Sequence, residues 1–340
     1  MLARKRLFLL AIPAAISTIS LGLFLSSSPA VAITSDKVSA ERIRLIQENI
    51  EKLHPNASTE LKQQIAEIAV KAIENQIFVE GGTFMMGDFG MKCKSDRYAP
   101  TWEEGTVCYA TFHLNDKPAH KVTLSSYSLS KYETSLYEKE RFHLAHGLPL
   151  PFQKMREKKP NHWTLNPTIA AGTGSWQEAK DQCLWLGKLT SYEFDLPTEA
   201  QWEYAARNRG QKIFYATDNG TIKRHINTPD DEIYPVDSFP PSPLGFHHMQ
   251  SNVTEWVNDW FDDKYYQNSP ELDPKGPKKP PIVKVLNKDP GHFRILRGGN
   301  TTWDPTVMTS RAPYPPVIGK HPYYPDHGFR CSIQSPEPPY

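Results

Sequence analysis

The segment LPTEAQWEYAAR, residues 196–207, constrains the fold of this 340-residue chain more than any other, because it encodes a complete helix start. Thr198 is a favourable N-cap residue, and Gln201 is placed three positions later to bond back to the backbone N–H of the cap. Trp202 and Ala206 then share one helical face, where small residues permit close approach of a neighbouring element. A helix therefore begins after Thr198 and packs closely on one side.

The rest of the mature chain has a mixed texture. Short β-like runs at 78–86 and 121–132 are separated by Gly and Pro, and helical patterns occupy 176–186 and 199–207. In the second helix, Glu203 and Arg207 are spaced as an i, i+4 pair. The 30 prolines indicate long irregular loops, which need a rigid frame, buried aromatic residues or cross-links to hold one conformation.

A helical hairpin is predicted for residues 33–76. Ile43, Ile46 and Ile50 recur at helical spacing, Pro55 interrupts the pattern, and a second apolar helix follows a cap at Ser58 or Thr59. The hairpin either packs on the following domain or serves as a docking element.

Residues 1–32 have the pattern of a secretory signal: Arg and Lys residues first, then an apolar run at 7–25, then the small residues Ala30-Val31-Ala32. The pattern favours cleavage after Ala32, with an uncleaved anchor as the alternative. We therefore expect a periplasmic or secreted protein with no membrane association after cleavage.

Charge composition argues against a nucleic-acid partner. Lys and Arg total 39 against 38 Asp and Glu, so no basic excess is available for a phosphate backbone.

Seven sequence blocks occur in a fixed order along the chain. They are IFVEGGTFMMGD (77–88), PAHKVTLSSYSLSKYETS (118–135), SWQEAKDQCLWLGK (175–188), LPTEAQWEYAAR (196–207), SPLGFHHMQSNVTEWVNDWF (242–261), ILRGGNTTW (295–303) and GFRC (328–331). Together they resemble the sulfatase-modifying-factor family, which includes formylglycine-generating enzymes, ergothioneine-synthesis domains and pyoverdine-maturation proteins. The resemblance implies an α+β, C-type-lectin-like fold with little regular secondary structure over 77–335, preceded by the hairpin.

The chain has four cysteines, and an oxidising compartment favours two disulfides, for which the sequence alone permits three pairings. Cys183 and Cys331 match a pair that is bridged in family members. The resemblance therefore implies Cys183–Cys331 and, with it, Cys93–Cys108.

The family's oxidase chemistry uses two further cysteines shortly after the GG(S/N) block, whose thiolates bind Cu(I). In this chain residues 300–315 contain no cysteine, and an ungapped reading places Met308 and Pro313 at those positions. Copper is therefore not expected.

A structural calcium ion is implied by the resemblance at the block FHHMQSNVTEW. Here Glu255 is retained, but His248 replaces an acidic or amide residue, Ser251 replaces glycine and Thr254 replaces tryptophan. Calcium prefers oxygen ligands to imidazole, so this site is weakened. A second calcium position would use Asn227 with Asp230 or Asp231.

The histidines suggest another metal site only weakly. His247 and His248, with Glu255 or Asp259, could enter a non-haem iron or copper arrangement, but no ligand-spacing motif is present. Neighbouring residues of an extended segment point to opposite sides, so one histidine at most would face such a site.

The resemblance also implies a peptide-binding groove along the late loop. Its predicted residues are Asn300, Trp303, Met308, Arg311 and Tyr314. We therefore expect a binding protein for a peptide or protein partner in the periplasm, rather than an enzyme. The alternatives are a metal-dependent oxidase of the pyoverdine-maturation type and, less favoured, an active formylglycine-generating oxidase.

Overall fold

The computed structural model describes residues 32–340, apart from 97–98, 106–107, 231, 286–288, 300–307 and 318–325. The predicted signal segment lies outside these residues except for Ala32. The helices are α1 (Ala40–Leu53), α2 (Thr59–Glu74), α3 (Leu136–Ala145), α4 (Gln153–Lys158), the 3-10 helix η1 (Trp163–Leu165), α5 (Trp176–Thr190), α6 (Glu199–Ala206) and α7 (Tyr265–Asn268). The strands are β1 (Gln76–Val79), β2 (Gly82–Met86), β3 (His120–Leu124), β4 (Tyr127–Ser130), β5 (Phe194–Asp195), β6 (Thr254–Trp260), β7 (Arg294–Arg297), β8 (Ala312–Tyr314), β9 (His327–Gly328) and β10 (Ser332–Ile333).

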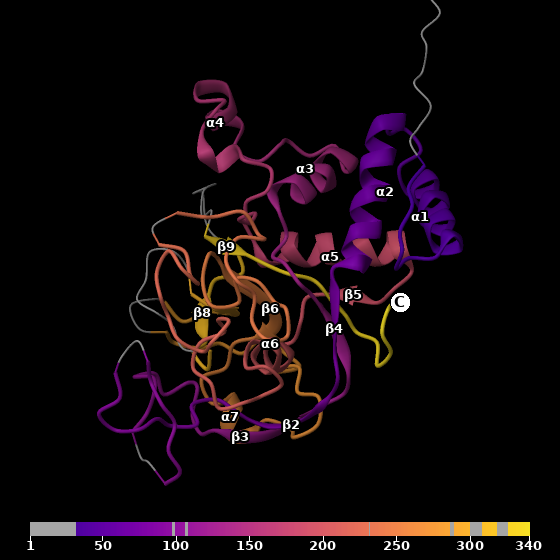
Figure 1. Ribbon diagram of the computed structural model, residues 1–340. Helices are drawn as coiled ribbons and strands as arrows, with labels where there is room; N and C mark the ends of the chain where they lie inside the picture. The colour runs from indigo at the N-terminus through magenta and orange to yellow at the C-terminus, as the bar shows by residue number, and fades with distance from the viewer. Residues whose placement is uncertain are drawn as a thin grey trace, which may run out of the picture. The chain divides into compact units, whose positions relative to one another are not determined.

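The two N-terminal helices form the predicted hairpin, and they lie beside α5 (Figure 1). Ser39 and Ser58 cap them, each accepting a hydrogen bond from a backbone N–H of the first turn. The isoleucines Ile46, Ile50 and Ile65 are fully buried in one hydrophobic cluster with α5 and β10. The hairpin is thus packed against the following domain by its apolar face.

The described strands form three sheets. Their strand orders are β1-β4-β10-β5, β2-β3 and β8-β7-β6-β9. The β6–β9 pair is parallel, whereas the other pairs are antiparallel.

The two predicted β-like runs are each divided between two sheets. The chain leaves the first sheet after β1 and enters the second at β2, and it makes the reverse crossing between β3 and β4. Gly81 lies between β1 and β2 and packs against the segment between β3 and β4. A Cβ at Gly81 would come within 2.3 Å of the Leu124 carbonyl oxygen. The two corners therefore pack backbone to backbone, a contact between distant segments that strand periodicity does not report.

A long excursion, residues 87–119, separates β2 from β3 although these strands pair directly, Met86 opposite His120. It forms the purple lobe in Figure 1. The Cys93–Cys108 disulfide closes it, and buried Asp88 accepts hydrogen bonds from Gly90 N, Ala110 N and Thr111 N at its base. The base of the excursion is thus held by specific polar contacts.

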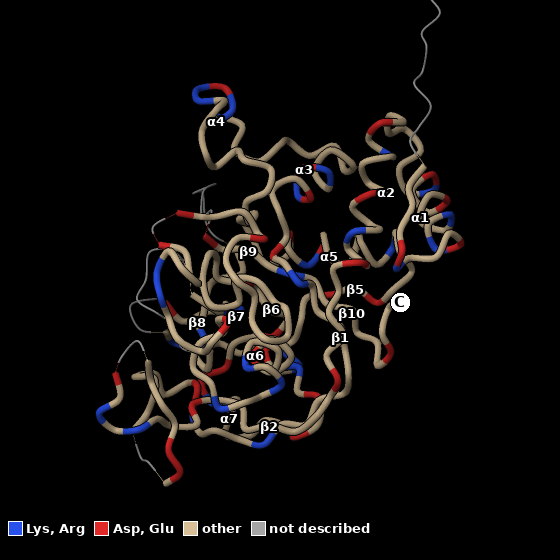
Figure 2. The backbone as a smooth tube through the Cα atoms, viewed as in Figure 1, with Lys and Arg blue, Asp and Glu red and all other residues tan. Residues whose placement is uncertain are grey.

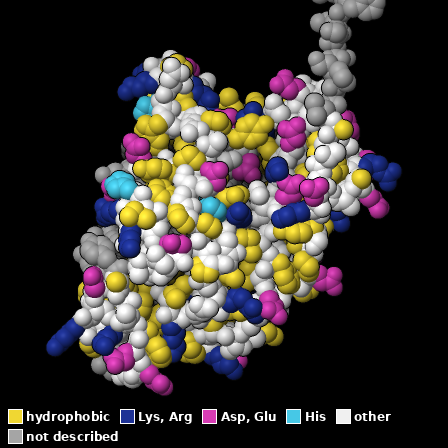
Figure 3. Space-filling view, in the orientation of Figure 1, with side chains coloured by type: hydrophobic (Ala, Val, Ile, Leu, Met, Phe, Trp, Pro, Cys, Tyr) yellow, Lys and Arg dark blue, Asp and Glu magenta, His cyan; other side chains and the backbone are white. Residues whose placement is uncertain are grey.

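Charged residues lie both outside and inside the domain. Acidic and basic positions mark the outer turns of α1, α2 and α4, but also α6 at the centre of the fold (Figure 2). On the face in Figure 3, the described acidic, basic and hydrophobic side chains are interspersed. In the described part of the chain, no helix combines the length and apolarity required to cross a bilayer.

Candidate functional site

Helix α6 places two glutamates in the interior. Thr198 caps the helix, and the predicted capping box is confirmed: Thr198 Oγ1 accepts from Gln201 N at 3.1 Å and Gln201 Oε1 accepts from Thr198 N at 2.9 Å. Every residue of α6 is buried, including Glu199 and Glu203. Buried carboxylates require cationic partners, so this helix needs arginines from elsewhere in the chain.

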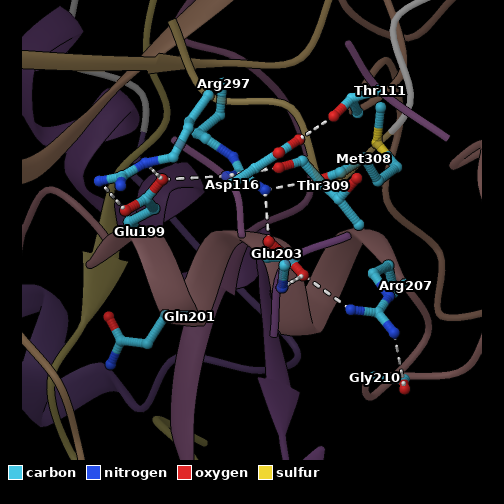
Figure 4. Close-up of polar contacts among 12 residues, drawn as sticks. Thr111, Asp116, Glu199, Gln201, Glu203, Arg207, Gly210, Arg297, Met308 and Thr309 are labelled. Carbon is cyan, nitrogen blue, oxygen red and sulfur yellow. Dashed lines mark hydrogen bonds and ion pairs between the residues drawn. The ribbon is translucent and has the colours of Figure 1, made fainter. Parts of the chain in front are cut away.

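Three arginines meet these glutamates in an ionic network, of which Figure 4 labels Arg207 and Arg297. Arg297 on β7 bonds Glu199 at 3.0 Å and Glu203 at 2.7 Å, and Arg207 bonds Glu203 at 2.7 Å. Arg311 donates from Nε and Nη2 to the two oxygens of Glu199, at 2.8 and 2.9 Å. Arg297 also donates to the carbonyl oxygen of Met308, so the network holds the described end of the late loop.

The network sets the charge states of the buried acids. Burial by itself would raise the pKa of Glu203, but Arg297 and Arg207 outweigh burial and hold that pKa below its usual value. Asp259, which accepts from Glu199 N at 2.8 Å, has its pKa raised to about 7 by burial and by the charge of Glu199. Glu203 is thus ionised at neutral pH, whereas the raised pKa of Asp259 lies close to neutral pH.

Glu255, a predicted calcium ligand, has both carboxylate oxygens engaged. Oε1 and Oε2 accept from Arg330 at 2.7 and 2.8 Å, and Oε2 also accepts from Trp202 Nε1 at 2.9 Å. Arg330 is fully buried and further donates to the carbonyl oxygen of His247. A carboxylate bound by a guanidinium and an indole N–H does not fit a calcium ligand.

His248, the other residue predicted at this site, is buried in a left-handed backbone conformation with φ of 58°. Its Nε2 lies 3.2 Å from the Pro235 carbonyl oxygen, and burial lowers its pKa to about 3. His247 Nδ1 lies 3.5 Å from the Ser238 carbonyl oxygen, so both rings contact the same turn, in which Ser238 N donates to the Pro235 carbonyl oxygen.

The second predicted calcium position is only partly described, because Asp231 lies outside the described residues. Asn227 is buried and stabilises its own loop: Nδ2 donates to Asp218 at 2.8 Å and Oδ1 accepts from Lys223 N at 2.7 Å. Asp230 pairs with Arg224 at 2.9 Å. Across the described residues, no three His, Cys, Asp or Glu side chains are arranged to hold a metal ion.

The predicted groove residues fall into three groups. Asn300 and Trp303 lie outside the described residues. Met308 and Arg311 are buried, at 0% and 2% exposure, rather than lining an accessible surface. Arg311 is buried because Glu199 needs it as a counter-ion. Tyr314 on β8 is half-buried, and its ring packs edge-on against Trp256.

Tyr314 belongs to a cluster that sequence reasoning missed, which we call the β6–β9 cluster: Thr254, Trp256, Tyr314 and His327. Thr254 Oγ1 donates to the Asp326 carbonyl oxygen at 3.0 Å and lies 2.8 Å from His327 Nδ1, so we assign the Nδ1 proton to a bond with that hydroxyl. The Tyr314 and His327 rings are 4.6 Å apart. The one sequence feature that could have pointed to this cluster is Thr254, which stands where the family block has tryptophan.

Both implied disulfides are present. Cys183 on α5 is bonded to Cys331 beside β10, and Cys93 is bonded to Cys108 in the excursion. The chain has four cysteines in all, and none of them is a free thiol.

The chain is similar to several characterised proteins. A formylglycine-generating enzyme of Streptomyces coelicolor is 28% identical over 273 residues, covering 68% of this chain and 79% of that enzyme. The formylglycine-generating enzyme of Mus musculus is 34% identical over 142 residues, 37% of this chain and 33% of that enzyme. The serine/threonine-protein kinase Pkn1 of Chlamydia trachomatis is 35% identical over 125 residues, 37% of this chain but 18% of the kinase.

The fold is also similar to that of PvdO from Pseudomonas aeruginosa, with a TM-score of 0.56 at 21% identity over 76% of this chain and 94% of PvdO. The family model described as the sulfatase-modifying factor enzyme 1-like domain matches residues 62–335. The match begins inside α2 and includes every block quoted above, so this chain belongs to the sulfatase-modifying factor enzyme 1-like domain family.

Proposed function

We propose that this family member binds a peptide or protein partner and does not oxidise thiols by the copper route. The observation that carries the proposal is that all four cysteines are used in disulfides. Cu(I) is held by soft thiolate ligands, and the chain retains no thiol to supply one.

Met308 does not replace the thiolates. A thioether is an uncharged and weak ligand, and this side chain is fully buried in the hydrophobic cluster that includes Trp202 and Phe246. Its carbonyl oxygen is bonded to Arg297. The residues at this position therefore do not fit a Cu(I) centre, and we derive no oxidation step through one.

The binding surface we propose is centred on the β6–β9 cluster. Trp303 lies outside the described residues and is included only because the sequence places it in the predicted groove. Tyr314 is half-buried and offers a flat apolar face, which the fully buried Trp256 supports from behind. Thr254 and Asp326 are partly exposed beside it. Aromatic residues are enriched at protein-binding surfaces because they bury much area at low entropic cost. In this proposal Arg311 positions the loop through Glu199 and does not touch the partner.

The proposed compartment is the periplasm or the cell exterior. Two disulfides are typical of oxidising compartments, since cytosolic thiols are kept reduced. The signal-like pattern of residues 1–32 supports the same compartment.

A turnover assay tests the loss of oxidase chemistry. The protein, isolated from the periplasm, is supplied with Cu(I), oxygen and a cysteine-containing peptide, and aldehyde formation and oxygen uptake are measured. We expect neither. Conversion of the peptide, or one tightly held copper or iron ion per chain, would instead support an oxidase.

A capture experiment tests the surface. Trp303→Ala and Tyr314→Ala are expected to reduce recovery of a cross-linked partner from periplasmic extract. Trp163→Ala is the matched control, because Trp163 is an exposed tryptophan on η1, outside the proposed surface. Equal recovery by all three variants would contradict the proposed surface.

A further inference from the structure

A cluster of two histidines lies where the N-terminal hairpin meets the domain. His54 is the C-cap residue of α1, His146 is the C-cap residue of α3, and Trp185 lies on α5. The His54 and His146 rings are 5.4 Å apart, and the His54 and Trp185 rings are 6.1 Å apart. Three separate elements therefore meet at His54, which is 9% exposed.

The hydrogen bonds fix the protonation state of His54. Trp185 Nε1 can only donate, and it donates to His54 Nε2 at 2.9 Å, so Nε2 must carry a lone pair. The other ring nitrogen donates to the backbone carbonyl of Ala145. A neutral imidazole thus has both nitrogens satisfied, and a second proton would break the bond to Trp185.

The surroundings offer little to stabilise a charged imidazolium. Phe142 packs against His146 at 4.4 Å and against Trp185 at 5.5 Å between ring centroids. His146 Nδ1 bonds to the Phe142 carbonyl oxygen at 2.8 Å, so this ring is held in place facing His54. A proton on both rings would set two positive charges against each other in a largely apolar contact.

The charged groups of the neighbouring elements are engaged with one another. These pairs are Glu51 with Lys62 on the hairpin, Glu140 with Arg141 and Arg156 beside α3, and Glu178 on α5 with Lys139 and His143. The electrostatic influence on His54 comes from His146.

We propose that His54, His146 and Trp185 form a pH-sensitive contact that docks the N-terminal hairpin at neutral pH and loosens it in acid. Burial, followed by the charge of His146, lowers the pKa of His54 despite the bond to Ala145. The docked state therefore binds a proton less readily than the open state, in which His54 has an ordinary pKa of about 6.5. The docking contribution is complete above that pH and is lost progressively as pH falls below it.

The rest of the hairpin contact is insensitive to this proton. Asn49 Nδ2 donates to the Leu189 carbonyl oxygen and Arg42 Nη1 to the Thr190 carbonyl oxygen, both at 3.0 Å. The Cys183–Cys331 bond ties α5 to the strand region independently of the hairpin. Acidification should therefore weaken the docking of the hairpin without unfolding the domain.

Hydrogen–deuterium exchange of the full chain between pH 7.5 and 5.0, corrected for intrinsic rates, tests this. Opening of α1 and α2 relative to β6 and β7 should rise by about tenfold per pH unit below about 6.5, until the pKa of docked His54 is reached. His54→Gln, which keeps one acceptor and one donor, should abolish this rise. His146→Phe should reduce its total size, because it removes the facing charge.

His113→Gln, an exposed histidine in the excursion, is the matched control and should behave like the wild type. The same pH response in His54→Gln as in the wild type would overturn the proposal, as would a flat response in the wild type. If His54→Gln does not fold, NMR titration of the wild-type imidazoles decides, since a His54 pKa at or above 6.5 contradicts the proposal.

Discussion

The surroundings of α6 and the N-terminal hairpin are both buried, but different forces hold them. Around α6, Glu199 and Glu203 are matched by arginines whose Nη and Nε atoms approach within 3.0 Å. The hairpin is held by isoleucines such as Ile46 and Ile50 and by hydrogen bonds such as that from Trp185 to His54. Ion pairs in the interior demand specific partners, whereas apolar contacts demand mainly volume. Small chemical changes around α6 should therefore destabilise the protein more than changes of similar size in the hairpin.

The largest effect is expected from Arg297→Met. The change leaves Glu199 and Glu203 with less counter-charge in the interior, so it should cost about 3–5 kcal/mol of unfolding free energy, measured by urea denaturation. Arg209→Met, at an exposed surface pair with Glu80, should leave the urea midpoint unchanged. A near-neutral Arg297→Met would remove the distinction between the two regions.

The hairpin counterpart is Ile46→Ala, which should cost roughly 2–5 kcal/mol because Ile46 is fully buried. Ile46→Leu conserves volume and should cost less than about 1.5 kcal/mol. Arg297→Lys, an equally modest change, should cost more, since lysine cannot reproduce the forked contacts. If Ile46→Leu loses more unfolding free energy in urea denaturation than Arg297→Lys, the hairpin contact depends on exact side-chain shape as much as the ionic network does.

Asp259→Asn probes the pH response of the α6 surroundings. Because the folded-state pKa of Asp259 is raised to about 7, its contribution to stability is complete below the unfolded pKa of about 4 and is lost as pH rises toward 7. The wild type should therefore lose about 2 kcal/mol relative to Asp259→Asn between pH 5 and pH 7. Asp263→Asn, at an exposed neighbour, should follow the wild type. The hairpin responds to pH in the opposite direction, because protonation of His54 weakens its docking. Stability measured against pH for Asp259→Asn and for His54→Gln therefore distinguishes the two regions.

The smallest effects are expected at the helix caps. Thr198→Ala breaks a buried capping box and should cost about 1–2 kcal/mol, whereas Ser58→Ala at an exposed cap should cost about 0.5–1 kcal/mol. Thermal unfolding of both variants measures the difference. An equal loss would show that burial adds nothing to the cap at α6.

Much of the fold followed from local pattern. The N-cap and capping box of α6, the hairpin with its break at Pro55, and α5 were predicted near their observed bounds, because capping and apolar spacing depend on residues within four positions. The division of the two β-like runs was not predicted, because the corner at Gly81 is decided by a neighbour more than 40 residues away.

The residues of the candidate site were predicted less accurately from the sequence than the helices were. Tyr314 was predicted from its place in the late loop, but its contacts with His327 and Trp256 depend on the order β8-β7-β6-β9 of the third sheet, which joins segments far apart in the sequence. Arg311 was predicted at a groove and is instead a buried counter-ion of Glu199. The peptide-binding role stays a proposal that the capture experiment tests.

By itself, the sequence determined the family blocks, the helix starts and, through the resemblance, the cysteine pairing. Only the tertiary structure decided which charges pair in the interior and which ring faces His54. The bonds Arg297–Glu199, Arg311–Glu199, Arg330–Glu255 and Trp185–His54 join residues 98, 112, 75 and 131 positions apart. Such bonds form because the fold removes both partners from water at the same place, and no local pattern encodes that coincidence.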